Sequence, residues 1–324
     1  MIVGTICFAT CQGIAHLARD FYQNGIIHRV LVHPHPHYPN YPDRYPGSYT
    51  HNTARQFLDG LDILLLFENG LDWDVVRQAV SRGVKIVVMP MYEYTPYPFP
   101  VPVDLYLCPS LLDMEVYEPL PCIYLPVPVC KPWTLRKTAH RFIHNAGHGQ
   151  WQYGKGTPEL LEAMNHVTSP VRLLVRGQPG EARIEQLFKR YQGHPRIDLV
   201  LGELPEAELY EPGDVFVYPE RYNGLSLPLQ EAYASGMLVM ATDHFPANTW
   251  LPTEPLIPVA GYEQVHIATT FRRAILDSKV IAHQLDTWYG QDITDFSQRG
   301  RQWALEHSWD KYKPRYLEVL DRLL

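Results

Sequence analysis

The chain has 324 residues, of which 46% are hydrophobic and 19% charged, so it can form one large domain or two ordinary ones. The formal net charge of −7 argues against a general nucleic-acid binder with a basic surface, although it does not exclude a local basic groove. The five cysteines lack the paired spacing of a metal site, and no apolar run approaches the ~20 residues of a membrane span. We therefore expect a soluble, cytoplasmic protein with reduced thiols.

Strands and helices alternate through the first half of the chain. Apolar runs predict strands at 2–8, 26–32, 61–67, 85–89, 103–108 and 122–127. Apolar residues at helical spacing predict helices over 14–24, 72–82 and 111–117. This alternation is typical of a parallel, doubly wound sheet. The turn at Gln12 and Gly13, between the first strand and the first helix, is a candidate cradle for a diphosphate or a sugar.

An unusual loop, HPHPHYPNYPDRYPGSYTHN, follows the second strand from His33 to Asn52. Its prolines exclude a helix, and its tyrosines, Tyr38 and Tyr41 among them, offer faces for stacking. Its alternating histidines could meet around a metal in an extended chain, but polyproline geometry would separate them, so we expect no metal there. Long loops in compact domains are usually functional, which favours a loop facing an acceptor molecule. A surface loop packed by its own aromatic rings is the alternative.

The second half begins after a linker at 130–140 and repeats the alternation. Strands are expected at 141–145, 171–175, 197–201, 215–218 and 238–241, with helices over 182–191 and 206–210 and from Ser226 to Gly236. A strand at 256–257 and two or three helices complete the chain. Ligands of an open α/β sheet bind where strands end and helices begin, so the loop at 220–226 is the expected site.

The segment from Gly224 to Gly236 reads GLSLPLQEAYASG, and it resembles the nucleotide-sugar site of the retaining glycosyltransferases of family four, which have the GT-B fold. The pattern of that family is roughly Glu-Gly-Phe-Gly-Leu-Pro, with a second glutamate eight residues after the first. The second glutamate matches Glu231, and the resemblance implies that this residue holds the ribose hydroxyls of the donor. Asn223 stands at the position of the first glutamate, which in the family contacts the transferred sugar.

The resemblance extends over residues 140–310 and implies further donor contacts. In the family, a Gly-Arg follows the first strand of this domain and a Lys-Gly opens the next helix, and the two basic side chains grip the diphosphate. Gly147 and His148 stand near the former position, and Lys155 matches the latter. The candidate catalytic residues are therefore Lys155, Glu231 and Asn223. The candidate donor-binding residues are Gly147, His148, Arg176, Glu203, Leu204, Gly224, Leu225 and Ser226.

Over residues 1–130 the resemblance is architectural only. The family often has a histidine that contacts the sugar after the strand at 85–89, and Tyr92 or Glu93 stands there instead. The candidate residues of the acceptor side are Gln12, Gly13, Tyr92, Glu93, Tyr38 and Tyr41. The implied fold is α/β, with two Rossmann-like doubly wound domains facing a cleft. We expect an acceptor-side domain at 1–131, a nucleotide-sugar domain at 132–307 and a last helix at 308–324 that packs back on the first domain.

The resemblance implies a glycosyltransferase that moves a sugar from a nucleoside diphosphate sugar, with UDP favoured and GDP possible, to an acceptor hydroxyl. Transfer would retain the anomeric configuration, without a bound metal and without a cofactor, since the nucleotide sugar is a substrate. The acceptor would be a small molecule or a glycan. One alternative is a DNA-base glycosyltransferase acting on a hydroxylated base, which the Tyr-rich loop could stack upon but the net charge disfavours. Another is a nucleotide-sugar-binding protein without turnover, suggested by Asn223 and by the missing arginine and histidine.

Overall fold

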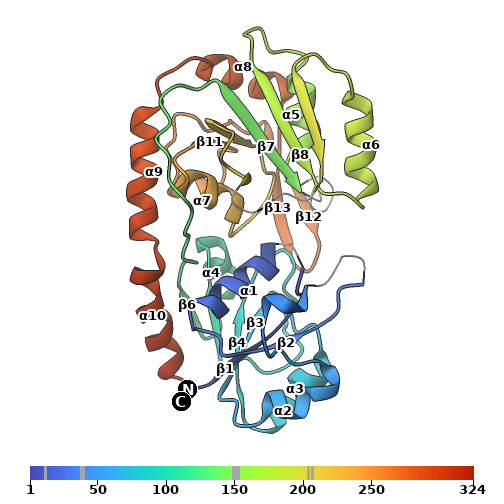
Figure 1. The fold of residues 1–324 in the computed structure, drawn as a ribbon, viewed down its shortest axis with the longest axis vertical. Coiled ribbons are helices and arrows are strands. Elements are labelled where there is room, and N and C mark those ends of the chain that lie inside the picture. Colours follow the sequence, from blue (N-terminus) through green and yellow to red (C-terminus); the bar gives the residue numbers. More distant parts are fainter. Residues whose placement is uncertain (11–12, 37–40, 148–153, 203–204, 206–207) are drawn as a thin grey trace. The chain divides into compact units, whose positions relative to one another are not determined.

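The computed structural model describes residues 1–10, 13–36, 41–147, 154–202, 205 and 208–324. The chain divides into two compact units (Figure 1). The first unit contains residues 1–128, 266–270 and 309–324, and the second contains 129–265 and 271–308.

The first unit is built on a six-stranded parallel sheet of order β2-β1-β3-β4-β5-β6. The strands are β1 (Val3–Cys7), β2 (Arg29–Val32), β3 (Ile63–Phe67), β4 (Lys85–Met89), β5 (Leu105–Cys108) and β6 (Cys122–Tyr124). The helices are α1 (Gly13–Gln23), α2 (Ala54–Leu58), α3 (Trp73–Ser81), α4 (Leu111–Tyr117) and α10 (Trp309–Asp321), with short 3-10 turns at Pro42–Arg44 and His51–Thr53. The predicted doubly wound alternation is confirmed.

Helices cover both faces of this sheet, which explains why its strands are continuous apolar runs. Leu64 and Leu66 of β3 share a buried cluster with residues of α2, α3 and α4. On the opposite face, Phe67 meets the ring of Phe21 from α1, with centroids 5.4 Å apart. Helix α10 joins this second face, because Tyr316 contacts Phe21 and donates its hydroxyl to the carbonyl of Leu125.

The second unit contains a five-stranded parallel sheet of order β11-β10-β7-β8-β9. Its strands are β7 (Arg141–Gly147), β8 (Arg172–Gly177), β9 (Ile197–Leu201), β10 (Val215–Tyr218) and β11 (Leu238–Ala241). Its helices are α5 (Thr157–Ala163), α6 (Ala182–Tyr191), α7 (Leu227–Ala234), α8 (Ser278–Trp288) and α9 (Thr294–Glu306), with a 3-10 turn at Ala247–Thr249. The short helix expected over 206–210 lies partly outside the described residues.

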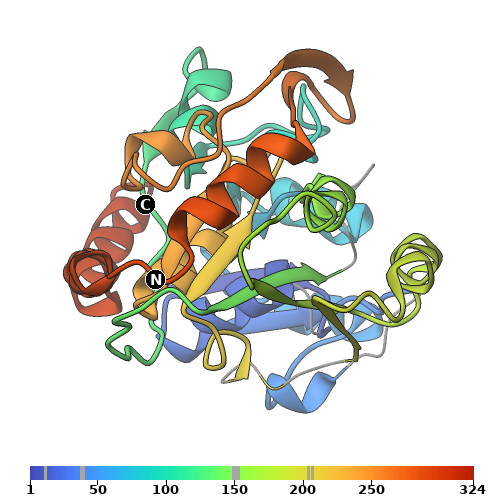
Figure 2. The same ribbon diagram turned by 90° about the horizontal axis from the view of Figure 1, so that it is seen from above.

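Alternate residues of the central strand β10 enter two different cores, as the period of a strand requires. Val215 and Val217 pack with residues of α5, α6 and α8. Phe216 and Tyr218 pack with residues of α7 on the other face. The helices on the two faces can be followed by colour in Figure 2. This packing holds α7 against β10, and the two elements are joined by the residues 219–226.

A two-stranded ribbon of β12 (Gly261–His266) and β13 (Thr270–Ile275) was not expected from the sequence. Its strands pair with each other and carry charged side chains, so they lack the apolar runs of the sheet strands. Arg221 joins the ribbon to the loop after β10, with its Nη2 2.7 Å from Oε1 of Glu263 and its Nε 2.9 Å from the carbonyl of Ala274. Arg273 shares the same carboxylate oxygen, at 2.8 Å from its Nη2.

Candidate functional site

The candidate site is formed by two turns at the carboxyl end of the second sheet, where ligands of such sheets bind. One turn, at 154–156, leads into α5, and the other, at 219–226, leads from β10 into α7. The amide of Arg221 donates to the carbonyl of Gly154 at 2.5 Å. Gly156 has a φ of 65°, and a Cβ there would lie 2.0 Å from the carbonyl oxygen of Pro219. Only glycine allows this approach, which fastens the two turns together.

Lys155 stands in the centre of the first turn. Its amino group lies against the backbone of β7, because a Cβ added to Gly147 would be only 2.6 Å from Nζ. Nζ is also 6.0 Å from the centroid of the Tyr218 ring. Burial lowers the pKa of Lys155 to about 8, while the carboxylate of Glu220 acts in the opposite direction. The ammonium form therefore predominates at neutral pH. Gly147, with a φ of 55°, leaves the space that this side chain needs.

His144 on β7 was not singled out from the sequence, yet its side chain hydrogen-bonds to β10 and to the start of α5, the elements next to the two turns. It is buried, with Nδ1 2.8 Å from the carbonyl of Val217 and Nε2 2.9 Å from the hydroxyl of Thr157. Since a carbonyl can only accept, Nδ1 donates and Nε2 accepts. Burial, aided by the charge of Lys155, lowers the pKa of His144 to about 3 and keeps it neutral. The histidine thus ties β7 to β10 and to the first residue of α5.

The second turn contains a strained serine. Ser226 precedes α7 with a φ of 46°, a conformation that favours glycine, and the family pattern has glycine at this position. Its hydroxyl donates to Oε2 of Glu220 at 2.8 Å, and its amide donates to Oδ1 of Asn223 at 2.7 Å. The Asn223 side chain therefore has a local role at the entry to α7. Gly224 and Leu225, between these residues, are both buried.

Glu231 lies on α7 and has two partners. Its Oε1 is 3.0 Å from Nζ of Lys131, and its Oε2 accepts from the hydroxyl of Tyr210 at 2.7 Å. Neither partner was expected from the sequence, since Lys131 belongs to the linker and Tyr210 to the segment before β10. No local pattern joins these residues to α7, because the three come together only in the folded unit.

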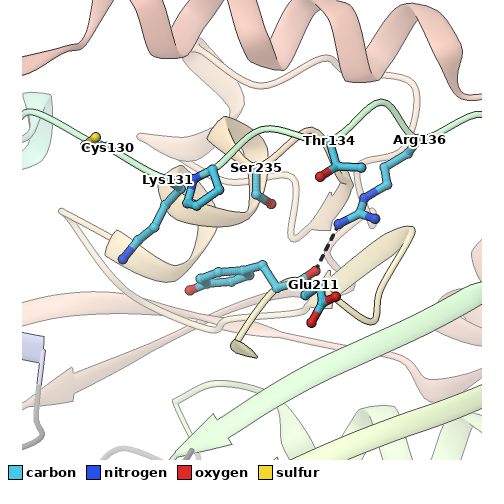
Figure 3. A pocket seen from close by; sticks show the side chains of 8 residues that line it. Cys130, Lys131, Thr134, Arg136, Glu211 and Ser235 are labelled. Carbon is cyan, nitrogen blue, oxygen red and sulfur yellow. Dashed lines mark hydrogen bonds between the residues drawn. The ribbon is translucent and has the colours of Figure 1, made fainter. Parts of the chain in front are cut away.

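Lys131 and Tyr210 also line a pocket of about 360 Å³ (Figure 3). Its other lining residues are Cys130, Pro132, Thr134, Arg136, Glu211 and Ser235. Arg136 is buried and donates from Nη2 to the carbonyl of Tyr210 at 3.3 Å, which steadies the backbone that carries the tyrosine. The pocket therefore adjoins the groups that hold the Glu231 carboxylate.

Arg176, a candidate for the diphosphate, instead supports this same segment. The side chain is buried, and its Nη1 lies 3.0 Å from the carbonyl oxygens of both Glu208 and Leu209. Burial lowers its pKa below the usual value for arginine. The candidates His148, Glu203 and Leu204 lie outside the described residues.

In the first unit, the described candidates for the acceptor side differ in their exposure to solvent. Gly13 begins α1, and a Cβ there would meet nothing within 4 Å, so this turn borders open space. Tyr92 and Glu93 are buried just after β4. The carbonyl of Tyr92 accepts from the hydroxyl of Thr269 at 2.6 Å, and its amide donates to Oδ1 of Asp113 at 2.9 Å. The candidates Gln12 and Tyr38 lie outside the described residues.

The described part of the loop at 33–52 is held by aromatic and backbone contacts. The amide of Tyr41 donates to the carbonyl of Ala9 at 2.6 Å, and the guanidinium of Arg44 lies 4.7 Å from the Tyr41 ring centroid. His33 and His35 lie against Phe8, with ring centroids 5.9 and 4.6 Å from it. Among the described residues, no group of three His, Cys, Asp or Glu side chains could hold a metal ion. In the same part of the chain, no helix is both long and apolar enough to cross a membrane.

Comparison with known proteins gives one family and a set of solved structures. Residues 143–257 match the family described as "Glycosyl transferases group 1". No curated protein sequence matches the chain. The chain is similar to HepE from Anabaena, solved with UDP and glucose, with a TM-score of 0.71 and 10% identity over 99% of this chain and 100% of that one.

Two further solved structures are similar to this chain. Sucrose-phosphate synthase from Thermosynechococcus elongatus has a TM-score of 0.66 and 14% identity, over 100% of this chain and 99% of that one. The pneumococcal O-GlcNAc transferase GtfA, solved with UDP and GlcNAc, has a TM-score of 0.60 and 13% identity. That match covers 83% of this chain but only 59% of GtfA. Residues 143–257 therefore match the glycosyl transferases group 1 family, and the chain has the fold of the GT-B glycosyltransferases.

Proposed function

We propose that the protein transfers a sugar from a nucleoside diphosphate sugar to an acceptor hydroxyl, with retention of the anomeric configuration. UDP is the favoured nucleotide and GDP the second. The family match over 143–257 supports this proposal, as do similar structures solved with UDP. The main observation behind the proposal is that the turn at 154–156 contacts the turn at 219–226. This contact brings the Lys155 region to the start of α7.

The diphosphate of the donor would lie over Lys155 and the start of α7. An ammonium group and the amides of a helix N-terminus both favour negative charge. As the bond from the anomeric carbon to the phosphate oxygen breaks, the negative charge on the leaving diphosphate grows. Groups already in place for that charge lower the barrier. Lys155 and the amides of Gly224 and Leu225 have this role in the proposal.

The ribose of the donor would be held by Glu231. Each carboxylate oxygen has two lone pairs, so a bond to Lys131 or Tyr210 leaves capacity for a ribose hydroxyl. The two partners fix the orientation of the carboxylate before the donor arrives. Such preorganisation reduces the entropy lost when the donor binds.

Transfer needs no carboxylate as a base. The acceptor oxygen bonds to the anomeric carbon on the side that the diphosphate leaves, and the hydroxyl proton passes to the departing phosphate oxygen. Phosphate charge is stabilised by the chain's own groups, so the proposal includes neither a metal nor a cofactor. The acceptor is a small molecule or a glycan, and we place it with the loop at 33–52 of the first unit.

Binding of a nucleotide sugar without turnover is the second candidate. It is favoured by Asn223, whose side-chain oxygen accepts from the amide of Ser226, at the position where the family has a sugar-binding glutamate. Turnover decides between the two candidates. A binding protein would retain affinity for the donor but would release no nucleotide.

The test begins with thermal shift and calorimetry on the full chain with UDP, GDP and a panel of their sugars. We expect one nucleotide to raise the melting temperature, since a ligand that binds the folded state stabilises it. Release of that nucleotide from its sugar, dependent on an acceptor, then demonstrates transfer, and NMR of the product gives its anomeric configuration. Failure of every nucleotide to bind contradicts the proposal. An inverted product contradicts retention alone.

A further inference from the structure

Glu220, directly after β10, is a carboxylic acid that the proposed reaction does not yet use. The residue is completely buried, at 0% exposure. Its Oε2 accepts from Ser226, while Oε1 is buried without a hydrogen-bond partner among the described residues. A buried polar atom without a partner costs stability, so it requires an explanation. The resemblance to the family does not explain this carboxylate, since Glu220 stands three residues before the position of the family glutamate.

The backbone contacts between the two turns place Glu220 beside Lys155. Pro219 and Arg221, the neighbours of Glu220, contact Gly156 and Gly154, the neighbours of Lys155. The two side chains influence each other as opposite charges do. Burial raises the pKa of Glu220 to about 8, and Lys155 opposes that rise. Glu220 in turn opposes the effect of burial on Lys155.

Two histidines near this pair, both among the described residues, are neutral. His244, after β11, is buried close to Glu220, and burial lowers its pKa below the usual value. His144 faces Lys155 from β7, with a pKa of about 3. Glu220 and Lys155 therefore titrate in the same pH range, each with a pKa of about 8.

We propose that Glu220 is a positioning residue of the donor site, which holds the Lys155 ammonium charged and in place and secures the left-handed turn at Ser226. This inference rests on the proposed function, because the importance of the ammonium lies in binding a diphosphate. Glu220 acts from beneath the site, through Lys155 and Ser226, and does not itself touch the donor. With the Glu220 carboxylate in place, the pKa of Lys155 is about 8, so the positive charge at the diphosphate position persists up to about that pH.

The first experiment measures the pKa of Lys155 by competitive labelling with acetic anhydride at a series of pH values, read by mass spectrometry of the labelled peptide. In Glu220→Gln the carboxylate charge is lost, so we expect the midpoint of Lys155 labelling to fall by roughly one pH unit, as expected for loss of a nearby opposite charge. Glu220→Asp keeps the charge and should stay near the wild-type midpoint. Glu162→Gln is the matched control, because Glu162 accepts from Tyr191 on α6, away from this site.

An unchanged Lys155 midpoint in folded Glu220→Gln overturns the inference. If that variant does not fold, Ser226→Gly supplies the second test. It removes the hydroxyl whose hydrogen bond lowers the pKa of Glu220, so the carboxylate forms at higher pH and the Lys155 midpoint falls by a smaller amount. An unchanged midpoint there overturns the inference equally.

Calorimetry with UDP and GDP separates this inference from the proposed function. At pH 6 Glu220 is protonated, so wild type and Glu220→Gln should bind the nucleotide equally. Above about pH 8 the variant should bind roughly tenfold more weakly, since its Lys155 has lost a proton. Equal binding at both pH values contradicts the positioning role. A shifted Lys155 midpoint without binding of either nucleotide contradicts the proposed function alone.

Discussion

The hydroxyl of Tyr210 lies 2.7 Å from Oε2 of Glu231, so a residue of the segment before β10 orients the carboxylate on α7. The backbone of this segment is itself held by Arg176 and Arg136, which donate to the carbonyls of residues 208–210. Arg176, which the sequence analysis gave as a candidate donor ligand, and the linker residue Arg136 thus both support a tyrosine. The position of the Glu231 carboxylate depends on that support.

Replacing Tyr210 with phenylalanine should weaken UDP binding by about tenfold. A hydrogen bond to a charged group contributes about 1.5–3 kcal/mol, and 1.4 kcal/mol corresponds to a factor of ten in affinity. Calorimetry measures the effect. Tyr191→Phe is the control, since its hydroxyl donates to Glu162 at 2.9 Å on another face of the unit. Equal affinities of the two variants would show that Tyr210 does not orient the donor.

Lys155→Ala and Glu231→Ala should each lower kcat/KM for the donor by roughly 10- to 100-fold or more while leaving the fold intact. Each removes a charged contact to the donor, of about 1.5–3 kcal/mol. Lys189→Ala, on the exposed face of α6, is the matched control for Lys155. Steady-state kinetics and circular dichroism together provide the measurement. A folded variant with wild-type kcat/KM would exclude its residue from the site.

The wild-type protein should lose affinity for UDP as the pH rises through about 8. Burial brings the pKa of Lys155 to about 8, so the ammonium is present below that pH and is lost above it. The terminal phosphate of UDP is already ionised there, because its second pKa is close to 6. Affinity measured by calorimetry from pH 6.5 to 9.5 should fall about tenfold per unit above the midpoint. In Lys155→Met this alkaline fall should disappear, and its persistence would assign it to another group.

Gly156→Ala should destabilise the second unit and separate the two turns. The added Cβ would lie 2.0 Å from the carbonyl oxygen of Pro219, and the φ of 65° is unfavourable for alanine. We expect a loss of at least about 1–3 kcal/mol in the free energy of unfolding by urea. Gly193→Ala is the control, since its φ is also positive, at 83°, but a Cβ there meets nothing within 4 Å. If both variants lose the same free energy of unfolding, the effect at Gly156 comes from backbone strain alone and not from the contact with Pro219.

Asn223→Ala should weaken the entry to α7, because Oδ1 of Asn223 accepts from the amide of Ser226. The loss should be about 1 kcal/mol, typical of a cap residue. Asn223→Asp keeps the acceptor and should stay close to wild type in stability. Thermal unfolding of the three proteins checks this order. If Asn223→Ala is as stable as wild type, the side chain serves the ligand and not the turn.

The sequence predicts the fold well because both sheets are buried on both faces, so their strands are apolar runs separated by helices of regular spacing. Ribbon β12–β13 was not predicted, since its strands lack an apolar run and contact the loop after β10 through residues such as Arg221 and Glu263. Lys155 and Glu231 were found through a local pattern. Their partners, Glu220 and Tyr210, depend on how distant segments meet, which no spacing along the chain reveals.

Lys131, whose Nζ lies 3.0 Å from Oε1 of Glu231, directly follows Cys130 in the chain. Cys130, next to Lys131, is an exposed free thiol that lines the same pocket. Among the described cysteines, Cys7 and Cys108 are buried and Cys122 is partly buried, so a maleimide dye should react first at Cys130. A fluorophore there would sit one residue from the lysine that contacts the Glu231 carboxylate, and its emission should change if a nucleotide binds at Glu231.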